Sequence, residues 1–417
     1  MMGKAIGNIR RRRRSYESLA VSNTPQGGNR KETNMTNVTI DQNKLKAAMD
    51  KALLKLDGLM EKFTEDFPAS SSKDGQYDHS ANRGGWTQCF YTGMLFLAYD
   101  YTKNEKYLNL AKKLVETFID RVDNMVGMGD HDIGFNFTLS TVAAYKCTGE
   151  KRYLEKSIAA ATVLGNRFRE KGQFIQLAGE ANCETKAYYR LIIDCLMNIN
   201  LLYFAGQASG DSEFTRKGFS HFNTTMETVV RDDGSTFQNF YFDQETGARL
   251  GGGTKQGKSD TSCWSRGQAW GVTGVPFTYA YMKNDEILNK YYSIVDYYLA
   301  RLPKDNVAYW DLDFTDGEEP RDSSAASIAV CGLNQALKDM PLDAEHKARY
   351  AKAMNDILES LIDNYASSEG DGKDGLLLHG TYYYAGNLGI DECCIWGDYF
   401  YLEALCRALN PDFKKFW

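Results

Sequence analysis

The feature that most constrains the fold is a recurring pair of helical segments, the first apolar on nearly all sides and the second charged on one face. A helix that is apolar all round must be buried, whereas a helix with a charged face must border solvent. Short turns such as KNEK and GEKR join the two members. The pairs are residues 92–102 with 103–118, 137–148 with 149–168, 192–209 with 210–226, 265–282 with 283–302, and 322–337 with 344–362.

The first and last helical segments of the sequence supply a sixth pair. Residues 395–409 read as an apolar helix, and the amphipathic helix over residues 44–63 is the one left to partner it. Six buried and six exposed helices satisfy their faces most simply by closing into a ring, so the sequence predicts an all-α fold, an (α/α)6 barrel. An open helical solenoid is the competing architecture. Strand-like alternation is confined to patches such as residues 235–243 and 375–384.

The first 38 residues differ from the rest. Five consecutive arginines, Arg10 to Arg14, precede text rich in Ser, Asn, Gly and Gln, without the apolar stretch that a secretory signal needs. We predict a disordered basic tail over residues 1–38 and a barrel domain over residues 39–417. A nucleic-acid-binding or targeting arm is the alternative for the tail.

The composition limits the kinds of molecule that the chain is expected to bind. A net charge of -6 argues against nucleic acid as the main partner, and no apolar run is long enough for a transmembrane helix. The nine cysteines are odd in number and form no CxxC pair, which favours buried, reduced thiols and predicts a cytoplasmic location, with the periplasm as the alternative. The histidines lack metal-site spacing, so no metal is expected. The 13% aromatic content suits a core and also a cleft that stacks sugar rings.

Four aspartates at the starts of apolar helices need explaining, because burying an unpaired carboxylate is expensive. They are Asp132, Asp194, Asp322 and Asp398. Each can be a helix N-cap or the partner of a buried arginine. Asp322, followed by SSAA, is predicted to be an N-cap, as is Asp41 before the first helix. Asp194 is flanked by apolar residues in LIIDCLMN, so a structural role explains it less well.

Several segments resemble the unsaturated glucuronyl hydrolases, glycoside hydrolase family 88, and the resemblance runs from about residue 82 to residue 409. It is carried by RGGWTQCFYTGMLFLAYD (83–100), HDIGF (131–135), RLIIDCLMN (190–198), WSRGQAWG (264–271) and ECCIWGDYFYLEAL (392–405). The related family 105, the unsaturated rhamnogalacturonyl hydrolases, is the nearest alternative. A catalytically silent sugar-binding barrel is a third.

The resemblance implies a cofactor-free hydrolase, monomeric or homodimeric. It would release a 4,5-unsaturated uronic acid from the non-reducing end of lyase-generated oligosaccharides by hydrating the C4=C5 vinyl ether. The family's two essential aspartates match Asp132 and Asp194, and its other site residues match Trp86, His131, Gln256, Arg266 and Trp270. The guanidinium of Arg266 suits a carboxylate, and the two tryptophans offer flat faces for a sugar ring. Arg266 and Trp270 are four residues apart and share one helix face.

The implied chemistry assigns the proton transfers to Asp194. Protonated Asp194 would protonate C4 and then, as a carboxylate, accept a proton from the water that attacks C5, while Asp132 stabilises the developing cation. Asp194 must therefore hold a proton near neutral pH. An apolar helix and a second carboxylate nearby both raise a carboxyl pKa, and the two groups should titrate as a coupled pair.

Two departures from the family pattern stand out. Gln238 occupies a position where the family has a histidine, and glutamine can form hydrogen bonds but cannot titrate. We expect it to contact the substrate. The loop over residues 172–189 lacks the family's tryptophan near Ala178 or Gly179, and Tyr188 or Tyr189 is a candidate for the missing ring.

Overall fold

The computed structural model describes residues 37–81, 84–179, 189–413 and 415–417. The predicted tail, residues 1–38, lies outside the described residues except for its last two positions. Residues 37–417 form one compact unit. Within the described ranges, no helix combines the length and apolar character needed to cross a membrane.

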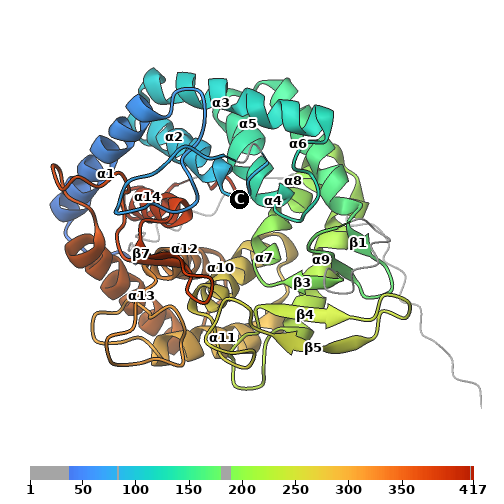
Figure 1. Cartoon of the computed structure of the whole chain (residues 1–417). Helices are drawn as coiled ribbons and strands as arrows, with labels where there is room; N and C mark the ends of the chain where they lie inside the picture. Colours follow the sequence, from blue (N-terminus) through green and yellow to red (C-terminus); the bar gives the residue numbers. More distant parts are fainter. Residues whose placement is uncertain (1–36, 82–83, 180–188, 414) are drawn as a thin grey trace, which may run out of the picture. The chain divides into compact units, whose positions relative to one another are not determined.

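The apolar segments form an inner ring of helices around the barrel axis (Figure 1). The inner ring contains α2 (Gln88–Thr102), α4 (Ile133–Phe137) continued by the π-helical turn η1 (Thr138–Val142) and α5 (Ala143–Thr148), α7 (Cys195–Asn198) with α8 (Asn200–Ser209), α10 (Ser265–Met282), α12 (Ser323–Asp339) and α14 (Ile395–Leu409).

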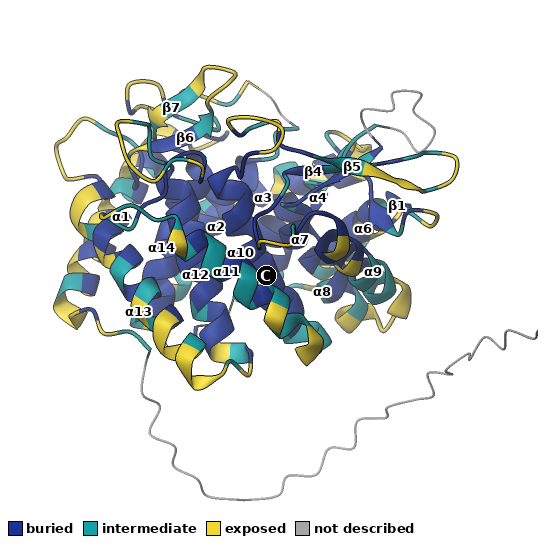
Figure 2. Ribbon diagram, turned by 90° about the horizontal axis from the view of Figure 1, so that it is seen from below, coloured by how far each residue is buried: buried dark blue, intermediate teal, exposed yellow. Residues whose placement is uncertain are grey.

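The charged segments form the outer ring. It contains α1 (Gln42–Lys62), α3 (Glu105–Asn124), α6 (Lys151–Gly165), α9 (Ser212–Thr228), α11 (Leu288–Ala300) after the short turn η3 (Asp285–Ile287), and α13 (Ala344–Ser360), which ends in η4 (Leu361–Tyr365). Figure 2 shows the inner helices almost wholly buried and the outer helices exposed along one face. The difference between apolar and amphipathic helices therefore sets which ring each one joins.

The inner ring is closed. Helix α2 packs on α4, α4 on α7, α7 on α10, α10 on α12, α12 on α14, and α14 on α2. Helix α1 packs on α14, so the first and last helices form the sixth pair. The predicted (α/α)6 barrel is confirmed, and the open solenoid is wrong.

In the described part of the chain, seven short strands lie in the loops that connect the helices. They form three antiparallel sheets: β1 (Phe168–Arg169) with β2 (Phe174–Ile175), β3 (Arg190–Ile192) with β4 (Asn239–Phe242) and β5 (Arg249–Gly253), and β6 (Gly380–Tyr383) with β7 (Leu388–Glu392). The predicted patches contain β4 and β6. Figure 2 shows β4 to β7 gathered at one end of the barrel.

Local predictions at the helix ends hold as well. The Asp41 side chain accepts hydrogen bonds from the amides of Asn43 and Lys44, and Asp322 accepts one from the amide of Ser324.

Eight of the nine cysteines lie in the described ranges, and all eight are free thiols. Cys147 is partly buried and the other seven are buried. Cys183 lies outside those ranges.

Candidate active site

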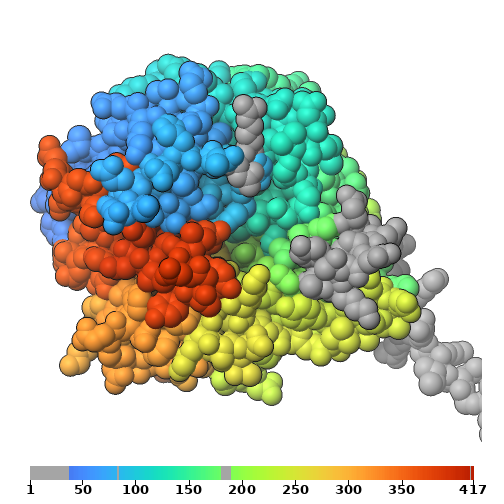
Figure 3. Space-filling view, viewed as in Figure 1, coloured from blue at the N-terminus to red at the C-terminus, as the bar shows by residue number. Residues whose placement is uncertain are grey.

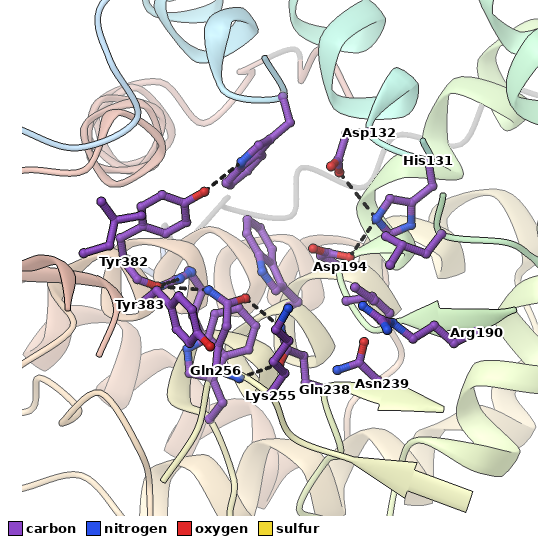
Figure 4. Close-up of a pocket in the computed structure, with 17 residues that line it drawn as sticks. His131, Asp132, Arg190, Asp194, Gln238, Asn239, Lys255, Gln256, Tyr382 and Tyr383 are labelled. Atoms are coloured by element: carbon purple, nitrogen blue, oxygen red, sulfur yellow. Dashed lines mark hydrogen bonds and ion pairs between the residues drawn. The ribbon is translucent and has the colours of Figure 1, made fainter. Parts of the chain in front are cut away.

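A pocket of about 280 Å³ opens at the strand-bearing end of the barrel. The space-filling view shows this end hollowed near its middle (Figure 3). All eight site residues predicted from the sequence line the pocket: Trp86, His131, Asp132, Asp194, Gln238, Gln256, Arg266 and Trp270. They come from six loops or helix starts between residues 86 and 270, and the closed ring brings them together (Figure 4).

The two aspartates are close because their helices touch. Asp132 directly precedes α4 and Asp194 directly precedes α7. Gly134 in α4 approaches the backbone of Asn198 in α7 so closely that a Cβ atom at Gly134 would lie 2.3 Å from the Asn198 Cα. A side chain there would push the two helices, and with them the two carboxyl groups, apart.

His131 lies between the carboxyl groups (Figure 4). Its Nε2 is 3.4 Å from Asp194 Oδ1 and 3.6 Å from Asp132 Oδ1. The Asn198 side chain donates a 3.2 Å hydrogen bond to Asp132 Oδ1 and accepts one from the amide of Phe135. The imidazole is 1% exposed, whereas the Asp132 and Asp194 side chains keep 16% and 21% of their surface open to the pocket. A small molecule in the pocket can therefore reach the carboxyl groups.

The electrostatics of the cluster favour protons on the carboxyl groups. Burial, opposed by the Arg266 charge and reinforced by the Asp130 charge, raises the pKa of Asp194 to about 7. Burial, together with the charges of Asp130 and Asp194, raises the pKa of Asp132 well above its usual range. Burial lowers the pKa of His131, which leaves its imidazole neutral. A carboxyl group that titrates near pH 7 can both donate and accept a proton there.

Asp130 belongs to the cluster and was missed from the sequence. Its Oδ1 accepts a 3.0 Å hydrogen bond from the amide of Asp132, and burial raises the pKa of its own carboxyl group. The available signal was the alternation in GDHDIGF, which places two aspartates around His131. Asp130 thus fixes the start of α4 and adds negative charge beside Asp132 and Asp194.

The same groups match the ligand types of a metal site. One atom from each of His131, Asp132 and Asp194 lies within 4.8 Å of the others, and no further such group occurs among the described residues. Without a bound ion, the raised pKa values of Asp132 and Asp194 favour protons on both carboxyl groups. A cation bound here would have to displace those protons, since metal ligands must be deprotonated.

Comparison with known proteins identifies the family. Residues 59–387 match the family model of Glycosyl Hydrolase Family 88. The chain belongs to glycoside hydrolase family 88. An unsaturated chondroitin disaccharide hydrolase of Streptococcus pneumoniae is 45% identical over 371 residues, which cover 89% of this chain and 93% of that protein.

Two solved structures of a Streptococcus agalactiae unsaturated glucuronyl hydrolase share the fold of this family 88 chain. One superposes with a TM-score of 0.87 at 43% identity and covers 91% of this chain and 94% of that one. A variant complexed with dGlcA-GalNAc6S superposes with a TM-score of 0.80 at 40% identity and has the same coverage. The family 105 alternative is therefore not retained.

The position of Arg266 differs from the simple expectation of a free guanidinium fork. Its Nη1 donates to Asp322 Oδ2 at 2.6 Å and to the carbonyl of Thr381 at 2.7 Å, and its Nη2 donates to the carbonyl of Tyr382 at 2.6 Å. Arg266 and Asp322 are 2% and 0% exposed. Asp322 is thus both an N-cap and the partner of a buried arginine, and most of the Arg266 donors are held within the protein.

Gln238 is locked to Gln256 in this family 88 site. Its Nε2 donates to Gln256 Oε1 at 2.6 Å, and its Oε1 accepts a 2.8 Å hydrogen bond from the amide of Gln256. Gln256 Nε2 in turn donates to the carbonyl of Tyr382. Gln238 therefore orients Gln256 with both ends of its amide.

The aromatic rings are distributed differently from the prediction. Trp86 is partly exposed and donates from Nε1 to the hydroxyl of Tyr382 at 3.2 Å, whereas Trp270 is 1% exposed. Tyr189 is buried edge-on against Phe174 and does not line the pocket, and Tyr188 lies outside the described residues. The additional rings come instead from Trp264 and from Tyr382 and Tyr383 on β6. None of these three residues was predicted to line the site.

Proposed function

We propose that this family 88 chain removes a 4,5-unsaturated uronic acid from the non-reducing end of oligosaccharides by hydrating the C4=C5 double bond. The observation that carries the proposal is the Asp194 carboxyl group, which faces the pocket, lies 3.4 Å from His131 and has its pKa raised to about 7. Such a group can act as an acid and then as a base in one cycle. The names of the relatives point to the same reaction class.

The first step transfers a proton to carbon. The double bond of the unsaturated uronate is a vinyl ether, whose electrons make C4 the basic carbon. The Asp194 hydroxyl gives its proton to C4, and positive charge develops at C5 and the ring oxygen. Asp194 is left as a carboxylate beside that cation, which it stabilises.

The second step adds water. The Asp194 carboxylate accepts a proton from a water molecule while the water oxygen bonds to C5. The product is a hemiketal at C5, which opens by breaking the bond between C5 and the ring oxygen. The resulting hemiacetal at C1 then releases the remaining sugar as an alcohol. Asp194 ends the cycle protonated, as it began.

We assign a supporting role to Asp132 and His131. Both carboxyl groups lie near the same imidazole nitrogen, so the charge on one affects the proton on the other. Burial and the charges of Asp130 and Asp194 raise the pKa of Asp132, which favours its protonated form, and we treat the two carboxyl groups as one acid–base unit. Asp132 positions the uronate and stabilises the charge that develops on the ring.

The proposed substrates are unsaturated disaccharides of the chondroitin type. The support is the name of the Streptococcus pneumoniae relative and the dGlcA-GalNAc6S ligand of the Streptococcus agalactiae structure. Lys255 is exposed and lines the pocket, and no described carboxylate forms an ion pair with it (Figure 4). We assign to Lys255 the contact with an anionic substituent on the second sugar.

The test of this function is the loss of ultraviolet absorbance. The conjugated alkene of an unsaturated uronate absorbs near the ultraviolet edge, and hydration removes the band. The protein is incubated with unsaturated disaccharides from chondroitin, heparin, alginate, ulvan and pectin. We expect decay with the chondroitin disaccharide, and an unchanged band with every disaccharide would refute the proposed function.

Location and assembly stay predictions. The eight free cysteines in the described ranges are compatible with the cytoplasmic location that we propose, with the periplasm as the alternative. We expect a monomer or a homodimer.

A further inference from the structure

An aromatic layer fills the barrel axis directly below the pocket. Its rings come from four inner helices and from Trp417, and each is at most 1% exposed. The layer consists of Phe90 from α2, Phe135 from α4, Trp270 and Phe277 from α10, Tyr399 and Phe400 from α14, and Trp417.

Trp417 is held firmly within this layer. Its ring is stacked on Phe400, with centroids 5.9 Å apart and an interplanar angle of 4°, and it meets Phe135 edge-on at 5.8 Å. Its Nε1 donates a 2.9 Å hydrogen bond to Glu403 Oε2. Glu403 is fully buried and pairs with Arg407 at 2.6 Å. The polar end of the indole is therefore anchored on α14, and its ring faces the inside of the barrel.

Two of the rings that Trp417 contacts, those of Phe135 and Phe400, also support the pocket. Phe135 lies 5.5 Å from Trp270 and 6.0 Å from Trp86, and Phe400 lies 5.5 Å from Trp270. The amide of Phe135 also donates to Asn198, whose side chain holds Asp132. Phe135 thus joins the Trp417 ring both to the tryptophans of the site and to one of its carboxyl groups.

Trp417 also borders a second cavity. This cavity, of about 520 Å³, lies where α2, α5, α10 and α12 end, and Trp417 lines it together with Lys415 and Phe416. The inner segments that end there begin near the active-site pocket, α5 through its continuation from α4, so the two cavities lie at opposite ends of the barrel. The Trp417 ring stands between the second cavity and the aromatic layer. Removing it would leave the underside of Phe135 and Phe400 without a packing partner.

We propose that Trp417 is a positioning residue for the active site, which holds Phe135 and Phe400 and through them Trp86, Trp270 and Asp132. The kinetic test of this inference rests on the proposed function, because it needs turnover of the substrate. The binding test does not need turnover. Trp417 touches no substrate. Instead, it packs against the rings that support the pocket residues, on the side that faces the opposite end of the barrel.

The test compares three variants. Trp417→Ala removes the ring, Trp417→Phe keeps a ring but loses the bond to Glu403, and Phe416→Ala is the matched control. Phe416 is also buried and lines the same cavity, but its ring contacts Phe96 and not the layer below the pocket. Small shifts of reacting groups can cost up to about a hundredfold in rate. We expect Trp417→Ala to lower kcat/KM by about tenfold to a hundredfold, and Trp417→Phe to stay within about threefold of the wild type.

The measurements separate positioning from stability. Activity is assayed well below the melting temperature of each variant, with near-ultraviolet circular dichroism to verify the fold. Phe416→Ala should lose stability but keep kcat and KM within about twofold, since its neighbours do not reach the site. If Trp417→Ala does not fold, Trp417→Leu takes its place, with an expected loss between those of the Ala and Phe variants.

A binding assay keeps the inference independent of turnover. In the Asp194→Asn background, calorimetry measures the Kd of the unsaturated chondroitin disaccharide with and without Trp417→Ala. We expect the second substitution to weaken binding by about tenfold through Trp86 and Trp270. Unchanged kcat/KM and unchanged Kd in the folded Trp417→Ala protein would overturn the inference. Equal losses in Phe416→Ala would overturn it too, since they would show a general effect of destabilisation. A wild-type protein that leaves the disaccharide intact would instead count against the proposed function.

Discussion

The buried pair between Arg266 and Asp322 offers the most quantitative prediction. Asp322→Asn keeps an acceptor for the helix cap but removes the negative charge that faces the Arg266 guanidinium at 2.6 Å. The arginine would then be a buried charge without a counter-ion. Two carbonyl groups, those of Thr381 and Tyr382, would still accept its hydrogen bonds.

Removing one partner of a buried ion pair typically costs about 3–5 kcal/mol. We expect the lower end, about 3 kcal/mol, because the two carbonyl groups keep part of the compensation. The entropy of unfolding is about 2.1 cal/mol/K per residue, or about 0.8 kcal/mol/K for roughly 380 residues. A loss of about 3 kcal/mol therefore lowers the Tm by about 4 °C. Asp322→Ala also loses the cap, at a further cost of about 1 kcal/mol.

Urea unfolding and thermal melting measure these losses, and a double-mutant cycle identifies their cause. Arg266→Met in the Asp322→Asn background removes the unpaired charge, so the double variant should be more stable than the sum of the single losses predicts, by about 2 kcal/mol. Losses that simply add, or a loss below about 0.5 kcal/mol for Asp322→Asn, would refute the reasoning.

Two further predictions concern the pocket. Because Asp194 must be protonated to start the reaction and its pKa is raised to about 7, kcat/KM should fall as the pH rises above about 7, measured from the initial decay of ultraviolet absorbance; a profile that rises through this range would contradict the assignment of Asp194 as the acid. Lys255→Ala should raise the KM for a sulfated unsaturated disaccharide by about tenfold, with little effect on its unsulfated counterpart and with Lys255→Arg as the control that keeps the charge; equal effects on both disaccharides would remove Lys255 from anion recognition.

The sequence predicted the barrel well because the helix pattern is a direct record of burial. Segments such as residues 322–337 are apolar on all sides and therefore had to be inside, and six of them close a ring. The pairing of segments also predicted the correct partner for α14, which is α1 at the start of the barrel domain. Asp132 and Asp194 were found through the family resemblance, and the apolar surroundings of Asp194 marked it independently.

The rest of the site depends on contacts that no local pattern encodes. Tyr382 lies 116 residues beyond Arg266, and only the closed barrel brings its carbonyl group to that guanidinium. Arg266 and Asp322 are 56 residues apart, and their ion pair was not predicted because each residue alone fits another role equally well. Gln238 was expected to contact the substrate, but its hydrogen bonds to Gln256 depend on the pairing of β4 and β5.

The central claim is that Asp194 delivers a proton to C4 of the unsaturated uronate, and product analysis in D₂O tests it most directly. Nuclear magnetic resonance of the wild-type reaction should show loss of the alkene and deuterium at C4 of the released uronate. Asp194→Asn should leave the alkene intact while still binding the disaccharide. A released sugar that keeps its double bond, or an Asp194→Asn protein that labels C4 at the wild-type rate, would contradict the account.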